Sequence, residues 1–177
     1  MESRAKLFGH PIHQMLIVFP LGLLATAVIF DIIYLVTDNR RWTEMAFWMI
    51  LAGIISGLVS AVFGLIDWLA IPRNTRAKAI GLMHGGGNVL VVLLFIGSWL
   101  LRRNAPDNPD ITALALSFIA FALAAVTGWL GGELVDRLGV GVDDGANLNA
   151  PNSLFHKHVT NQGSKHEATS PTTRRAA

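Results

Sequence analysis

Four long runs of apolar residues restrict what this chain can fold into. Residues 45–66, 79–101 and 111–132 contain no Asp, Glu, Lys or Arg, and residues 14–37 contain only Asp31. Each run has the roughly 20 residues that a helix needs to cross a hydrocarbon core of about 30 Å. In a soluble protein, four such helices in succession would leave no polar exterior. The sequence therefore predicts four transmembrane helices, at about 11–37, 44–70, 79–101 and 111–136.

The connections between these runs are short and rich in turn residues. They read TDNRRWTE, IPRNTRAK and RRNAPDNPD, and such short loops make neighbouring helices antiparallel. We expect an all-α fold, an integral membrane up-down four-helix bundle formed by residues 1–142. No internal repeat is evident in the sequence. Residues 143–177 are polar, and we expect them to form a disordered C-terminal tail because they can bury little apolar surface.

Composition excludes several classes of function. The chain has no cysteine, so a disulfide, a thiolate metal site and a covalently attached haem are excluded. Most basic residues flank the helices, and the net charge of +2 gives no basis for nucleic-acid binding. The sequence contains no serine elbow, no phosphate-binding glycine loop after a strand and no HExxH motif. We therefore do not expect an enzyme.

Basic residues near the helix ends predict the orientation. Six lie on the side that holds the termini and four on the other, a bias that favours cytoplasmic termini. The six are Arg4, Lys6, Arg73, Arg76, Lys78 and Arg137, and the four are Arg40, Arg41, Arg102 and Arg103.

Unusual polar residues collect on the side of the termini. His10 and His13 open the first helix in GHPIH, Asp67 and Glu133 lie near the ends of the second and fourth helices, and His84 lies early in the third. The antiparallel topology puts all five in one slab near one membrane face. Because Pro11 suits a first helical turn, we expect His10 at the helix cap and His13 about one turn inside.

His84 should have a polar partner, since an unpaired polar group in hydrocarbon costs several kcal/mol. By topology, the nearest candidates are His13 and Asp67. Asp31 lies about 27 Å along the helix from His13 and cannot share this site. We expect it to pair with Arg40 or Arg41 at the opposite face.

Glycines accompany these residues. Gly85, Gly86 and Gly87 follow His84 directly and weaken the helix there, which suggests room for a ligand as well as packing. Gly53 with Gly57, and Gly128 with Gly132, have the spacing that packs membrane helices closely. Three further histidines lie in the polar tail: His156, His158 and His166. We expect them to be solvated, and metal binding is the alternative.

Four motifs in the sequence resemble those of a known bacterial membrane family. FGHPIHQMLIVFPLGLL, GLIDWL, LMHGGGN and GWLGGELVDRLGVGV are similar to the family called domain of unknown function 2231, over about residues 7–142. The resemblance implies a four-helix protein of the bacterial inner membrane whose biochemistry is undefined. Relatives joined to cytochrome or Rieske-type domains would imply a redox setting and electron-transfer partners, although this chain carries no such domain.

Three functions fit these residues. The first is a b-type haem with His13 and His84 as axial ligands, where Gly85, Gly86 and Gly87 make room for the macrocycle. The second is a non-haem metal site built from His10, His13, Asp67, His84 and Glu133. The third, the commonest use of polar groups in membranes, is a cofactor-free proton relay or structural subunit. The residues alone leave these alternatives open.

Overall fold

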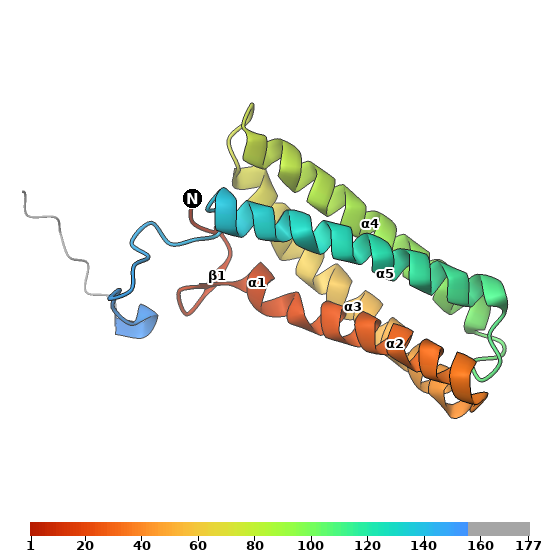
Figure 1. Cartoon of the computed structure of the whole chain (residues 1–177). Helices are drawn as coiled ribbons and strands as arrows, with labels where there is room; N and C mark the ends of the chain where they lie inside the picture. The colour runs from red at the N-terminus through yellow and green to blue at the C-terminus, as the bar shows by residue number, and fades with distance from the viewer. Residues whose placement is uncertain (156–177) are drawn as a thin grey trace, which may run out of the picture.

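A computed structural model describes residues 1–155 and has four long helical spans lying side by side (Figure 1). The helices are α1 (Ile12–Leu16), α2 (Val18–Thr37), α3 (Arg41–Ala70), α4 (Arg76–Arg102) and α5 (Ile111–Gly132), followed by the π-helical turn η1 (Glu133–Arg137). All four spans are long and apolar enough to cross a membrane. The predicted all-α four-helix bundle is confirmed, with boundaries within a few residues of those expected.

The first span is divided into α1 and α2 at Ile17. Pro20 has no backbone N–H, so it cannot bond to the carbonyl of Leu16, four residues earlier. The neighbouring bonds persist, because Ile17 N–H donates to His13 O at 3.1 Å and Leu21 N–H donates to Ile17 O at 3.2 Å. The single helix predicted over 11–37 is therefore interrupted after its first turn, the turn that carries His13.

A tight hairpin precedes the first helix. Strands β1 (Lys6–Leu7) and β2 (His10–Pro11) pair antiparallel, and Phe8 and Gly9 between them both have positive φ, at 50° and 84°. Two such residues form the primed turn that suits the twist of a hairpin. Pro11 is the N-cap of α1, so the prediction that His10 caps the helix is wrong: His10 lies in β2.

The N-terminal residues bond to the segment that follows η1, beside the helix ends, and we call this set of contacts the clasp. The Met1 ammonium donates to Gly139 O at 3.1 Å, and Gly141 N–H donates to Met1 O at 2.9 Å. Lys6 pairs with Asp143 at 3.5 Å, and Asp144 N–H donates to a Glu2 carboxylate oxygen at 3.3 Å. These contacts of Asp143 and Asp144 lie at the start of the segment expected as a tail, 143–177, and the part of that segment after residue 155 lies outside the described residues. Of residues 145–155, only Ser153–Phe155 forms a regular element, the short helix η2.

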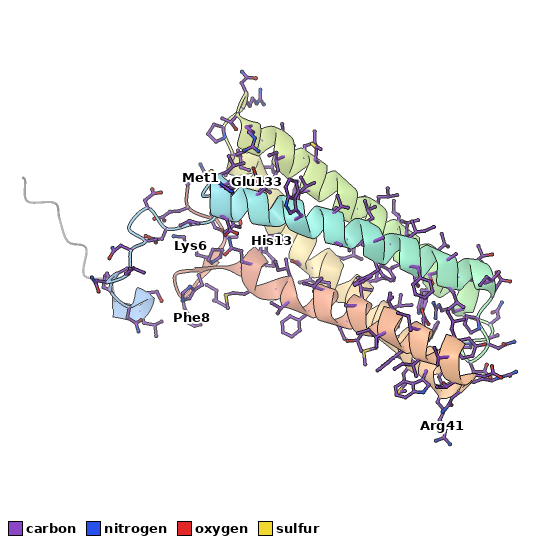
Figure 2. All side chains as sticks on the ribbon, viewed as in Figure 1. Met1, Lys6, Phe8, His13, Arg41 and Glu133 are labelled. Atoms are coloured by element: carbon purple, nitrogen blue, oxygen red, sulfur yellow. The ribbon has the colours of Figure 1, made fainter. Side chains whose placement is uncertain are left out.

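The bundle has two distinct ends. Figure 2 shows Met1, Lys6, His13 and Glu133 at one end and Arg41 at the other. We call the first the histidine end and the second the loop end. The histidine end holds the N-terminal hairpin, the start of α4 and the end of α5. The loop end holds the α2–α3 and α4–α5 connections (Figure 1).

The helical hairpins α2–α3 and α4–α5 share one pattern of buried positions. Helices pack more extensively within each hairpin than between them. A shift of 71 positions takes three of the four buried residues of α2 onto buried residues of α4, and a shift of 67 takes five of the eight buried residues of α3 onto buried residues of α5. The structure thus contains a repeat that the residue identities conceal. The matched pairs are Leu24 and Phe95, Ala27 and Ser98, Asp31 and Arg102, Ala46 and Ala113, Phe47 and Leu114, Ile50 and Ser117, Gly53 and Ala120, and Ser60 and Thr127.

Single-cysteine variants test the topology, because the chain contains no native cysteine. Cysteines replacing the exposed residues Phe8 and Arg73 should react with a membrane-impermeant maleimide from one face, and those replacing Arg41 and Ala105 from the other. The measurement is labelling in sealed right-side-out and inverted vesicles. Labelling of positions 8 and 73 from opposite faces would contradict the four-span arrangement.

Truncations test where the folded part ends. Stopping the chain after Gly145 should leave the melting temperature in detergent unchanged, because the clasp to Met1, Glu2 and Lys6 is kept. Stopping after Arg137 removes the clasp and should cost about 1–3 kcal/mol, since each net hydrogen bond contributes about 0.5–1.5 kcal/mol. Equal melting temperatures for the two truncations would show that the clasp does not stabilise the bundle.

Candidate functional site

His13 is held against α3 at the histidine end (Figure 2). Its Nδ1 lies 2.9 Å from Ser60 O and 3.2 Å from Ser60 Oγ. The ring lies on Gly64, where an added Cβ would be 2.8 Å from the imidazole Cε1. A glycine is required here because any side chain at position 64 would displace the ring. The imidazole is thus fixed by one carbonyl and one glycine of the neighbouring helix.

His84 is held against α5 in the same way. Its Nδ1 lies 2.8 Å from Thr127 O, and a Cβ added at Gly131 would be 3.0 Å from its Cε1. Thr127 and Gly131 are four positions apart, as are Ser60 and Gly64. Each histidine therefore lies beside the same pair of features on its neighbour: a carbonyl that receives Nδ1 and, one turn later, a glycine that receives the ring.

The carbonyl contacts determine which ring nitrogen carries the proton. A carbonyl oxygen can only accept, so each contact is a hydrogen bond when Nδ1 is the protonated nitrogen. In neutral imidazole the other nitrogen, Nε2, then keeps its lone pair. This is the tautomer that metal-ligating histidines adopt when Nδ1–H donates to a backbone carbonyl. With Nδ1 protonated in this way, the lone pair of each ring lies on Nε2.

Asn88 lies one turn after His84 and covers its ring. The amide Nδ2 is 3.3 Å from Nε2 and 3.5 Å from Nδ1 of His84, and it donates to His84 O at 2.9 Å. Nearly equal distances to both ring nitrogens put the amide over the ring face and away from the in-plane lone pair of Nε2. Thr127 Oγ1 donates to Asn88 Oδ1 at 3.1 Å and fixes the amide. The lone pair of His84 Nε2 is therefore left open.

Both imidazole rings are half-buried. The expectation that the partner of His84 is His13 or Asp67 is wrong for hydrogen bonding, since Nδ1 of His84 bonds to Thr127 O. Nδ1 of each histidine has its partner within its own helical hairpin, so neither ring needs the other as a hydrogen-bond partner.

The carboxylates of the predicted slab have structural partners. The single hydroxyl of Ser3 donates to the Asp67 carboxylate, with Oγ 2.8 Å from each carboxylate oxygen, and Arg4 N–H donates to Asp67 Oδ1 at 2.8 Å. Glu133 pairs with Arg76. His10 is exposed in β2, with Nε2 3.2 Å from Ser153 Oγ. Residues 1–155 contain no group of three or more His, Cys, Asp or Glu arranged to hold a metal ion.

The glycines differ in what they do. Gly87 lies against α5, where an added Cβ would be 2.5 Å from Thr127 Cγ2, whereas Cβ atoms at Gly85 and Gly86 would meet nothing within 4 Å. Gly53 receives Leu24 and Gly57 contacts Pro20, so this pair packs helices as expected. The expected packing of Gly128 and Gly132 is absent from the described structure, because Cβ atoms there would meet nothing within 4 Å.

Sequence reasoning missed Ser60, Gly64, Asn88, Thr127 and Gly131. A signal for four of them was present, since SAVFG in α3 and TGWLG in α5 both read hydroxyl residue, three others, glycine. The tail residues His156, His158 and His166 lie outside the described residues, so the metal-binding alternative for them stays untested.

Comparison with known proteins identifies the family. Residues 9–144 match the family described as "Predicted membrane protein (DUF2231)", so the chain belongs to that family. The match covers His13, His84, both helical hairpins and the C-terminal side of the clasp, whereas Met1, Glu2 and Lys6 lie outside it. Neither the curated proteins nor the solved structures contain a match to this chain.

Alanine substitutions test the two ring-glycine contacts. Gly64→Ala and Gly131→Ala should each lower stability by about 1–3 kcal/mol, because overpacking forces the histidine ring off its carbonyl. Gly128→Ala, in the same helix as Gly131, is the matched control. With open space around it, this change should stabilise the helix by about 0.5–1 kcal/mol. The measurement is thermal unfolding in detergent, and destabilisation by all three alanines alike would contradict the contacts.

Proposed function

We propose that the protein is a redox-linked membrane protein that binds one b-type haem, with His13 and His84 as its axial ligands. One observation carries this proposal. Both imidazoles donate Nδ1–H to a helix carbonyl, at 2.9 and 2.8 Å, and both keep Nε2 for a ligand. The two rings come from different helical hairpins at the same end of the bundle, and a b-type haem takes two axial ligands of this kind.

The number of ligands favours haem over a bare metal ion. A zinc or iron ion needs three or four protein ligands, and residues 1–155 contain no group of three or more His, Cys, Asp or Glu that could hold one. Haem brings four equatorial nitrogens of its own and needs only the two axial ones. The non-haem site with His10, Asp67 and Glu133 is less well supported, because the structure uses these side chains elsewhere.

The surroundings suit a haem near a membrane face. A bound haem would place its macrocycle among apolar helices and its propionates toward water. The exposed Arg4 and Arg73 at the histidine end supply cations for carboxylates of this kind. Gly85 and Gly86, beside His84, leave the α4 surface flat. When bound, haem would supply one-electron chemistry, and the protein would set its axial ligands and its access to water.

We also infer the setting in which this chemistry would occur. Electron-transfer proteins are the partners that a one-electron centre requires. The excess of basic residues at the histidine end favours a cytoplasmic location for that end, in the inner membrane of a bacterium. Maleimide labelling of position 73 in intact cells, before and after permeabilisation, tests this orientation.

Absorbance of the purified protein tests the haem directly. Protein from haem-supplemented cells, purified without chelator, should show an intense band near the blue edge of the visible that shifts on dithionite reduction. His13→Ala and His84→Ala should each abolish or displace the band, because each removes one axial nitrogen. His10→Ala is the control and should leave the spectrum unchanged, since this exposed ring lies in β2.

Two other outcomes would decide against the proposal. A colourless protein that contains stoichiometric zinc or iron would support a non-haem site. A colourless, metal-free protein would favour a cofactor-free role, in which His84, Asn88 and Thr127 act as a proton relay or as structural contacts.

A further inference from the structure

A buried ion pair joins the two hairpins at the end opposite to the histidines. Arg102 Nη1 donates to Asp31 Oδ1 at 2.7 Å and Nη2 to Oδ2 at 2.6 Å, and both side chains are fully buried, at 0% exposure. Arg102 also donates to Ser98 Oγ at 3.1 Å and to Ser117 Oγ at 3.2 Å. Asp31 was expected to pair with Arg40 or Arg41. This prediction is wrong, because Asp31 pairs with Arg102, and Arg40 pairs with Asp107.

This pair differs from the other charged contacts of the described residues. The Arg40–Asp107 pair is exposed and 3.7 Å apart, and Arg76–Glu133 lies within the α4–α5 hairpin and its following turn. Asp31 belongs to α2 and Arg102 to α4, so their contact crosses between hairpins. A bidentate carboxylate–guanidinium pair fixes orientation as well as distance. Within residues 1–155, it is the one fully buried ionic link between the two hairpins.

Asp31 and Arg102 hold the same position in the two repeats. Asp31 follows His13 by 18 positions, and Arg102 follows His84 by 18. Eighteen residues make about five helical turns, so in each hairpin the histidine and the charged residue project from one side of the span. Equivalent residues of two related units meet only near the axis that relates them. The ion pair therefore marks that axis, and each histidine lies about 27 Å along its span from the pair.

We infer that Asp31 and Arg102 are positioning residues, which align the two hairpins so that His13 and His84 approach the axis at the same depth. The alignment of the hairpins is argued from the ion pair alone, whereas its consequence for haem binding rests on the proposed function. Each imidazole is fixed to its own hairpin, by Ser60 or by Thr127, so only the register between hairpins decides how the two Nε2 atoms face each other. The bidentate pair supplies that register.

Spin labels on the chain measure this alignment without any ligand. Phe19 in α2 and Leu82 in α4 are exposed near the histidine end, and cysteines there report the distance between hairpins. Cysteines replacing Leu82 and Trp129, which is exposed in α5, report the distance within the second hairpin. The full-length protein, reconstituted without haem, should give a narrow distribution for both pairs.

The double variant Asp31→Leu with Arg102→Leu removes both buried charges and leaves neither unpaired. It should at least double the width of the between-hairpin distribution and leave the within-hairpin distribution narrow. Arg102→Lys, which keeps the charge and loses the two-pronged contact, should broaden the between-hairpin distribution less. Arg40→Ala, which breaks only the exposed pair, is the matched control and should change neither.

Exchanging the charges tests the equivalence of the two positions. Asp31→Arg with Arg102→Asp restores opposite charges, but Ala27 and Ile50 occupy the positions equivalent to Ser98 and Ser117. The exchange should recover only part of the narrow distribution, and adding Ala27→Ser should recover more. A between-hairpin distribution that stays narrow in the double-leucine variant overturns the inference. Broadening of both distributions also overturns it, because the pair would then support folding as a whole.

Absorbance separates this inference from the proposed function. If the parent protein binds haem, the double-leucine variant should lose most of the absorbance band along with the alignment. If the parent is colourless while the between-hairpin distribution still broadens, the positioning role stands and the haem proposal fails. If haem absorbance persists unchanged in a variant whose hairpins are misaligned, the pair does not position the imidazoles.

Discussion

Hydrocarbon offers no partner to a polar group, so polar side chains within the bundle take their partners from the protein, and Trp99 Nε1 is the one buried exception among the described residues. The arrangement of this fold follows from that constraint. His13 and His84 bond to carbonyls of neighbouring helices, and Asp31 bonds to Arg102. Apolar packing has little preference among helix faces when the surrounding lipid is equally apolar. The few polar contacts, together with the glycines that admit them, therefore select which faces of the helices meet.

The two kinds of polar contact act at different levels. The histidine contacts lie within each hairpin and fix a ring against a helix, whereas the ion pair crosses between hairpins and fixes their register. In this division, Nδ1 of each histidine finds its hydrogen-bond partner inside its own helical hairpin. Among the described residues, the histidine end has no buried ion pair between the helical hairpins. The haem proposed above would bind at that end.

Much of the architecture could be predicted because lipid imposes a simple rule. The uncharged runs gave four spans, and the short connectors gave the antiparallel order that brings His13 and His84 to one end. The polar partners could not be predicted, because they depend on helix rotation. Asp67 was expected to face His84, but it bonds to Ser3 and Arg4, since the N-terminal segment folds back over the end of α3. Arg102 was counted as a residue flanking its helix, yet its side chain is fully buried against Asp31. The repeat escaped notice because Asp31 matches Arg102 and Ala27 matches Ser98, so burial is preserved where chemistry is not.

The clasp between Met1 and Gly139 has a consequence for the order in which the molecule is assembled. The two residues are 138 positions apart, and the second lies beyond the last span. A chain inserted from its N-terminus would place α1 and α2 in the bilayer long before Gly139 emerges. Asp67 can receive Ser3 earlier, once α3 is complete, so the N-terminal segment can dock in two stages. The contact between Met1 and Gly139 forms only when all four spans are present, so it is the last step in the docking of the N-terminal segment.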